Sequence, residues 1–123
     1  MNPTAVQNQQ LFINGEWREA LDRRTFEKTN PFTGEAISRF SSAGRKDAAR
    51  AIDAASAAFP EWSATPSAVR RNLFLKAADI LDRRQPEIAR TMAMEMGGTF
   101  GWGMFNCIFA AALLREAAAQ AYG

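Results

Sequence analysis

The chain has 123 residues, of which 47% are hydrophobic and 23% are charged, and its formal net charge is +2. This is the composition of an ordinary globular protein, and the basic residues are scattered among acidic ones, so no nucleic-acid partner is expected. Histidine is absent and Cys107 is the only cysteine, which excludes an internal disulfide and a zinc site of the usual type. No apolar signal-peptide core opens the chain, and a lone cysteine is typical of a reducing compartment, so we expect a cytoplasmic protein.

The first third of the chain predicts short β-strands. Residues 1–10 are polar and show no apolar periodicity, so we expect a loose arm or an extended lead-in there. In the segment 11–18, an Asn-Gly pair separates the apolar run Leu11-Phe12-Ile13 from Glu16-Trp17-Arg18. Asn-Gly supplies the positive φ angles of a type I′ turn, so the segment predicts a β-hairpin. A second strand pair is expected at 25–29 and 35–41, joined by a turn that contains proline and glycine.

From residue 45 onward the apolar residues recur at spacings of three and four, which predicts helices. Four helices are expected because proline or glycine interrupts the pattern three times. They run over 45–59, 65–84, 86–96 and 102–122, and the interruptions are Pro60, Gln85-Pro86 and Gly97-Gly98. The many alanines of the first helix predict a close contact with another helix, and the second helix is expected to bury Val69, Leu73 and Ile80.

The last of these helices, 102–122, is apolar on nearly every side. Such a helix is normally buried, and its uninterrupted apolar part is shorter than the ~18 residues that a bilayer requires. We therefore expect no membrane span, and we expect this helix to be wrapped by other polypeptide.

An aromatic stripe runs along the start of the same helix. Trp102, Phe105 and Phe109 recur at spacings of three and four, and Asn106 lies beside the first and the last of them. Two interpretations stay open: the stripe is part of a core, or it is one wall of an apolar ligand channel in which the asparagine amide orients the ligand.

Other residues that could carry chemistry have simpler explanations. Cys107 lies in an apolar helix with no histidine or basic residue close in sequence to lower its pKa, which favours a small core residue over a nucleophile. The glycines between 97 and 103 follow no strand and do not match the dinucleotide-binding spacing, so they predict a bend. The acidic side chains on the helices are expected to be solvated surface instead of acid–base partners; they are Asp79, Asp82, Glu87 and Glu95. No catalytic, cofactor-binding or metal-binding residue is therefore assigned.

Several motifs together resemble the amino-terminal segment of the NAD(P)-dependent aldehyde dehydrogenase superfamily. They are LFINGEW at 11–17, NPFTGE at 30–35, DAARAIDAASAAFPEWSATP at 47–66, RRNLFLKAADIL at 70–81 and EMGG at 95–98. The tail WGMFNCIFAAALLREAAA is most similar to the bacterial members that oxidise aromatic aldehydes, the salicylaldehyde, vanillin and benzaldehyde dehydrogenases. The chain departs from the family at Glu95-Met96-Gly97, where the family has Glu-Thr-Gly.

The resemblance implies an α/β fold in which β-hairpins and four helices pack on a Rossmann-like cofactor domain. Residues 11–123 would be the N-terminal portion of that domain, and taken alone they are expected to be α+β and mostly helical. It also implies a cytoplasmic homo-oligomer, a dimer or a tetramer, that oxidises a small-molecule aldehyde through a cysteine thiohemiacetal and reduces NAD or NADP.

The family's nucleophile segment and cofactor-binding glycines have no counterpart in these 123 residues. We therefore expect the chain to be a fragment that is inactive and binds no cofactor alone. Trp102, Phe105, Asn106 and Phe109 are carried over as substrate-channel residues.

A different class of function remains as an alternative. The chain would then be a non-catalytic helical interaction module that self-associates through its apolar last helix. A discrete dimer with cooperative melting would favour this alternative. A membrane-surface helix is less favoured, because the last helix lacks a lysine-rich polar face.

Overall fold

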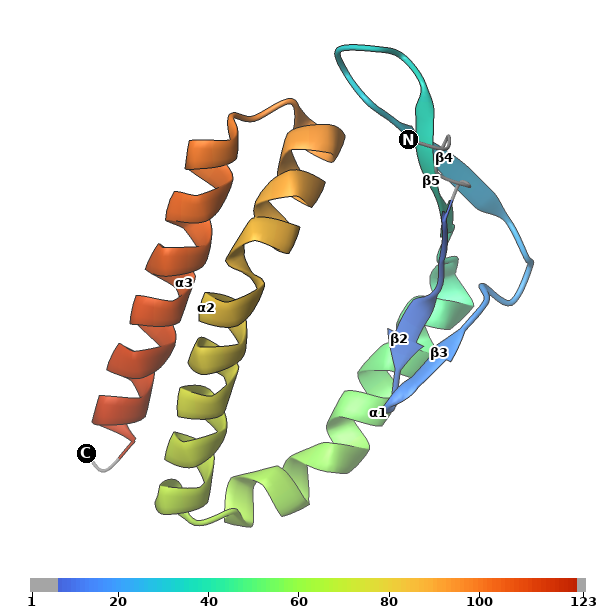
Figure 1. Ribbon diagram of the computed structural model, residues 1–123. Helices are drawn as coiled ribbons and strands as arrows, with labels where there is room; N and C mark the ends of the chain where they lie inside the picture. The colour runs from blue at the N-terminus through green and yellow to red at the C-terminus, as the bar shows by residue number, and fades with distance from the viewer. Residues whose placement is uncertain (1–6, 122–123) are drawn as a thin grey trace. The chain divides into compact units, whose positions relative to one another are not determined.

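The computed structural model describes residues 7–121, within which the chain forms five strands and three helices (Figure 1). The strands are β1 (Gln7–Gln9), β2 (Leu11–Ile13), β3 (Glu16–Arg18), β4 (Thr25–Thr29) and β5 (Ala36–Ser41), and the helices are α1 (Arg45–Ala64), α2 (Ser67–Met96) and α3 (Phe100–Gln120). The chain divides into two compact units, Met1–Ser63 and Ala64–Gly123. The mixed, mostly helical content agrees with the α+β expectation for this chain.

The first unit contains two small sheets. In one, β5 lies between β1, which is parallel to it, and β4, which is antiparallel. In the other, β2 and β3 form the predicted hairpin, and its turn residues Asn14 and Gly15 have φ angles of 55° and 78°. Both strand pairs predicted from the sequence are confirmed. Residues 7–9 of the expected arm form β1, so the extended alternative holds for them, and residues 1–6 lie outside the described part.

Two of the three predicted helix interruptions are wrong. Pro60 lies inside α1, and Pro86 lies inside α2, so the four expected helices are three. A proline removes one backbone hydrogen bond, and packing on both sides can keep a helix continuous. Ala78 and Ala89 are buried on either side of Pro86, which accounts for the continuity of α2. Gly97, in contrast, ends α2 as predicted: its φ is 71°, and its N–H donates to the carbonyl of Ala93.

The second unit is an antiparallel pair formed by α2 and α3 (Figure 1). The side chains buried in these two helices are small: Ala78, Ala89, Gly103, Cys107, Ala111 and Ala118. The helices lie very close at Gly103, where an added Cβ would lie 2.7 Å from the Cα of Ala89. Only glycine fits there, so small residues set the helix separation. We call this set of six residues the small-residue seam.

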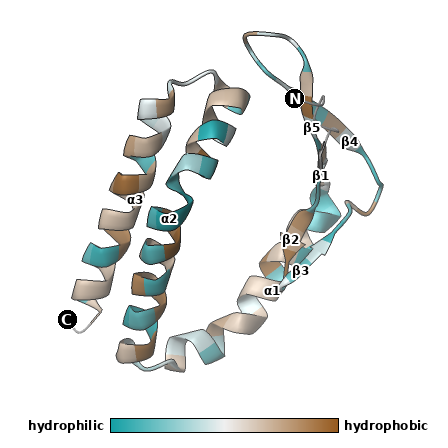
Figure 2. Cartoon of the chain, viewed as in Figure 1, coloured by the Kyte–Doolittle hydropathy of each residue, from teal (hydrophilic) through white to brown (hydrophobic). Residues whose placement is uncertain are grey.

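Large apolar side chains remain exposed in both units. None of the described residues with a large side chain is fully buried, and Ile52 and Phe59 of α1 are 68% and 64% exposed. The alanine-rich face of α1 is therefore open, and the expected close helix contact occurs in the seam instead. Val69, Leu73 and Ile80 are also exposed, because α3 packs on the alanine side of α2. Figure 2 shows hydrophobic colours along much of α3 and alternating colours along α2.

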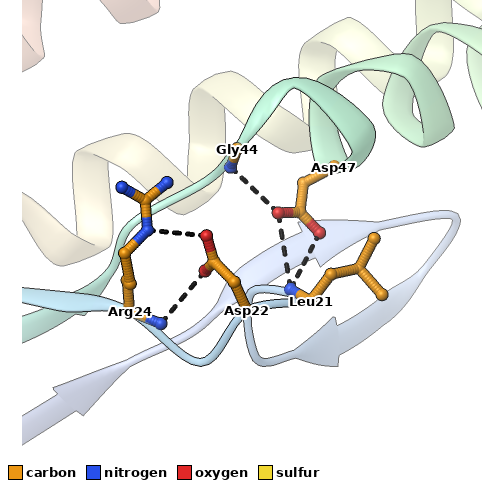
Figure 3. Close-up of polar contacts among 5 residues, drawn as sticks. All are labelled: Leu21, Asp22, Arg24, Gly44 and Asp47. Carbon is orange, nitrogen blue, oxygen red and sulfur yellow. Dashed lines mark hydrogen bonds and ion pairs between the residues drawn. The ribbon is translucent and has the colours of Figure 1, made fainter.

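One buried carboxylate organises the start of α1 (Figure 3). Asp47 is 3% exposed and accepts hydrogen bonds from the N–H groups of Leu21, at 3.1 Å, and Gly44, at 2.9 Å. The bond to Gly44 is the reciprocal half of a capping box, in which the third helical residue reaches back to the residue before the helix. The bond to Leu21 ties the loop after β3 to the helix N-terminus, where the helix dipole favours an anion.

Candidate substrate-channel site

The first turn of α3 is fixed by Thr99. Its hydroxyl oxygen accepts a hydrogen bond from the N–H of Trp102 at 3.2 Å, and its carbonyl accepts one from the N–H of Gly103 at 3.1 Å. This is the side-chain cap that threonine commonly supplies before a helix. The cap defines where the helix begins, and therefore which residues share a face.

The predicted aromatic stripe forms on that helix. The rings of Trp102 and Phe105 stack with centroids 5.4 Å apart, and those of Phe105 and Phe109 stack at 5.9 Å with planes 7° apart. The three side chains are 56%, 50% and 53% exposed. The core interpretation of the stripe therefore does not hold within this chain, since these rings present about half of their surface.

The stripe and the small-residue seam lie on nearly opposite sides of α3. Gly103, Cys107 and Ala111 follow one another at spacings of four and face α2, whereas the aromatic residues start one position earlier. At about 100° of rotation per residue, the three aromatic side chains project from α3 roughly opposite to the three residues that face α2. Packing of α3 on α2 therefore positions the rings without covering them.

Asn106 flanks the stripe and supplies its polar group. It is partly buried, and its side-chain Nδ2 donates a hydrogen bond of 2.8 Å to the backbone carbonyl of Trp102, one turn earlier. The structure thus brings all four predicted channel residues onto one side of α3. Their role as a substrate channel stays a prediction.

The other candidate residues take the places expected for structural groups. Cys107 is 3% exposed and belongs to the seam, which confirms the small core residue. Asp79 and Asp82 accept hydrogen bonds from Arg115 across the seam, at 3.0 Å and 2.6 Å. The bond from Arg115 holds the pKa of Asp82 below its ordinary value.

Glu87 pairs with Arg84 within α2, and the resulting hydrogen bonds lower its pKa in the same way. These carboxylates are exposed ion-pair members, not acid–base partners gathered in a cleft. Within residues 7–121, no three histidine, cysteine or acidic side chains come together to hold a metal ion. None of the described helices is long and apolar enough to cross a membrane.

Sequence reasoning missed two polar contacts. The sequence motif at 47–66 includes Asp47, but no role was assigned to this residue, although an acidic residue in a first helical turn is a known capping signal. The bridge from Arg115 to α2 could not be found, because its partners are more than 30 residues away.

The match to a family model covers residues 17–122, which is most of the chain, and the family is the aldehyde dehydrogenase family. The small sheets and three helices described above thus match the amino-terminal part of an aldehyde dehydrogenase fold. The chain belongs to this family.

Individual relatives agree with that assignment. A vanillin dehydrogenase from a Pseudomonas species is 47% identical over 110 residues, which are 89% of this chain and 23% of the relative. The crystal structure of a salicylaldehyde dehydrogenase from Pseudomonas putida, complexed with salicylaldehyde, superposes with a TM-score of 0.89 at 36% identity, over 92% of this chain and 23% of that one. An NAD-dependent benzaldehyde dehydrogenase from Corynebacterium glutamicum gives 0.88 at 27% identity, over 96% and 26%. The chain thus spans about a quarter of the length of these relatives.

Proposed function

We propose that this chain is the amino-terminal part of an enzyme that oxidises an aromatic aldehyde to the carboxylic acid, and that Trp102, Phe105, Asn106 and Phe109 form one wall of its substrate channel. The observation that carries the proposal is the exposed, stacked aromatic stripe with a polar group at its edge. Stacked aromatic rings offer a flat apolar surface to the ring of a ligand. The relatives named for vanillin, salicylaldehyde and benzaldehyde support the same substrate class.

The 123 residues alone are not expected to catalyse the reaction. The only thiol, Cys107, is buried in the small-residue seam and cannot reach an aldehyde on the opposite side of α3. The oxidant would be NAD or NADP, in line with the NAD-dependent benzaldehyde dehydrogenase among the structural neighbours, and we expect no cofactor site in this chain alone. The glycines between 97 and 103 join two helices, and one of them, Gly103, lies against α2. We therefore assign the thiohemiacetal chemistry and the cofactor to the part of the family fold that this chain does not span.

The same reasoning extends to partners and location. The large apolar side chains that remain exposed on α1, α2 and α3 would be covered by the remainder of the family fold, and residues 11–123 would then belong to the cofactor-binding domain. The complete enzyme would be a cytoplasmic homo-oligomer, a dimer or a tetramer.

Two measurements test the proposal. Incubation of the 123-residue chain with NAD and salicylaldehyde is expected to yield no NADH, and steady turnover would contradict this. In a chimera, residues 17–122 replace the matching segment of the Pseudomonas vanillin dehydrogenase. We expect this chimera to oxidise aromatic aldehydes.

Phe105→Ser in the chimera should lower kcat/KM for benzaldehyde about tenfold or more, because one buried aromatic contact is lost, and it should change kcat/KM for acetaldehyde little. Phe32→Ser is the matched control, because Phe32 is exposed in the turn before β5. Equal losses of kcat/KM for both aldehydes, or no loss for either, would contradict the assignment of Phe105 to the channel.

The self-associating module remains a second candidate, because the exposed aromatic stripe could also pair with a second copy of itself. Sedimentation of the 123-residue chain discriminates between the two. A discrete dimer that dissociates on Phe105→Ser would favour the module. A monomer or polydisperse aggregates would favour a segment whose apolar side chains are covered by the rest of the complete enzyme.

A further inference from the structure

The orientation of the Asn106 amide follows from its hydrogen bond. The backbone carbonyl of Trp102 can only accept, so the group 2.8 Å from it must be the NH2 of Asn106. The two ends of a planar amide are fixed relative to each other, so the carbonyl oxygen Oδ1 points away from the helix backbone. The helix thereby holds this oxygen in one defined orientation.

That oxygen is the only side-chain acceptor among the four predicted channel residues. The indole of Trp102 offers only an N–H donor, and the phenylalanine rings offer neither donor nor acceptor. Within residues 7–121, no donor to Oδ1 of Asn106 is found. A ring hydroxyl buried against the stripe would therefore lose its hydrogen bond to water unless this oxygen accepts it.

We infer that Asn106 is a specificity-determining residue that selects aldehydes whose aromatic ring carries a hydrogen-bond donor, namely hydroxybenzaldehydes, over those whose ring is unsubstituted or methoxylated. The inference rests on the proposed function, because it assigns a substrate class to the same channel wall. Asn106 is one helical turn from Trp102 and three residues from Phe109, so a ring stacked on either aromatic side chain can place a hydroxyl beside Oδ1. A site that accepts a substrate hydroxyl discriminates strongly against analogues that lack it.

The first test uses the full 123-residue chain and needs no catalysis. Phenol and anisole have similar shapes, but only phenol donates a hydrogen bond. Titration of the ¹⁵N-labelled chain, followed through the side-chain amide of Asn106 and the indole of Trp102, should show phenol binding about fivefold more tightly than anisole. Asn106→Leu should make the two affinities equal.

Gln120→Leu is the matched control for this titration. Gln120 is also an amide residue of α3, but it bonds to Glu116, away from the stripe. The control should leave the preference for phenol unchanged. Equal affinities of the unaltered chain for phenol and anisole, or a preference that survives Asn106→Leu, would overturn the inference.

The second test measures substrate choice in the chimera described above. The ratio of kcat/KM for 3-hydroxybenzaldehyde to that for 3-methoxybenzaldehyde should fall about fivefold to tenfold with Asn106→Leu, and Gln120→Leu should leave this ratio unchanged. If the chimera oxidises aromatic aldehydes but this ratio does not change, the inference fails and the proposed function stands. If the chimera oxidises no aromatic aldehyde, the proposed function fails, and the phenol titration still decides whether Asn106 selects donors.

Discussion

Each of the two units of the chain is held together internally by a different kind of contact. In Met1–Ser63, the contact that ties loop to helix is polar: the Asp47 carboxylate accepts backbone N–H groups from two segments. In Ala64–Gly123, the contact is steric: the helices meet through the small-residue seam, where a single glycine sets the separation. The stability of the first unit should therefore be most sensitive to the loss of polar atoms, and the stability of the second unit to the addition of atoms in the seam.

The largest expected effect is that of Gly103→Val in the seam. The new Cβ would lie 2.7 Å from the Cα of Ala89 and 2.9 Å from its Cβ, and backbone atoms cannot move aside without separating the helices. We expect the free energy of opening of the helix pair to fall by about 3 kcal/mol. Amide hydrogen exchange, measured peptide by peptide, should accelerate in α2 and α3 and stay unchanged in the hairpin formed by β2 and β3.

Gly101→Ala is the control for this prediction. Gly101 is also in α3, but an added Cβ would meet nothing within 4 Å outside the local helix backbone. Alanine should therefore stabilise the helix by about 0.5–1 kcal/mol. If both substitutions change exchange in the same direction, packing at Ala89 does not set the helix separation.

A smaller effect is expected from Asp47→Ala in the first unit. The substitution removes the acceptor of two backbone N–H groups, those of Leu21 and Gly44, and it leaves space where a buried carboxylate was. We expect the first unit to lose about 2 kcal/mol of stability. Exchange should accelerate around residues 20–22 and in the first turn of α1, with no change in α2 and α3.

Asp53→Ala is the control for the Asp47 prediction. Asp53 is an exposed aspartate of the same helix, so its removal should change stability by less than about 0.5 kcal/mol. If the two aspartates behave alike, charge on α1 matters more than the bonds that Asp47 makes.

The contrast between the units also explains what the sequence could predict. The hairpin at Asn14 and Gly15, and the end of α2 at Gly97, depend on backbone angles that one or two residues determine, and both were predicted. The continuity of α2 through Pro86 depends on seam contacts from the other helix, which local propensity does not include. For the same reason, the bond between Leu21 and Asp47 and the bonds from Arg115 to α2 were found only with the structure, because these partners are distant in sequence.

The candidate site divides in the same way. The shared face of Trp102, Phe105, Asn106 and Phe109 follows from helical spacing, and it was predicted. Their exposure could not be predicted, because it depends on which side of α3 packs on α2. The direction of the Asn106 amide depends on its bond to the backbone of Trp102, which spacing alone does not show.

The smallest expected effect concerns charge across the seam, and it appears as a dependence on pH. The hydrogen bond from Arg115 lowers the pKa of Asp82 in the folded chain, so the contact contributes stability above the unfolded-state pKa, about 3.9 for aspartate, and loses it as the pH falls through the lower, folded value. Asp82→Asn should therefore flatten the acid side of the stability profile of the helix pair. Glu87→Gln removes a carboxylate whose pKa is also lowered, but its partner Arg84 lies on the same helix. Exchange rates in α3 at decreasing pH should distinguish the two variants, because the bond from Arg115 to Asp82 joins α3 to α2, whereas the bond from Arg84 to Glu87 stays within α2. Identical profiles for Asp82→Asn and the unaltered chain would mean that the Asp82 carboxylate does not help to hold the two helices together.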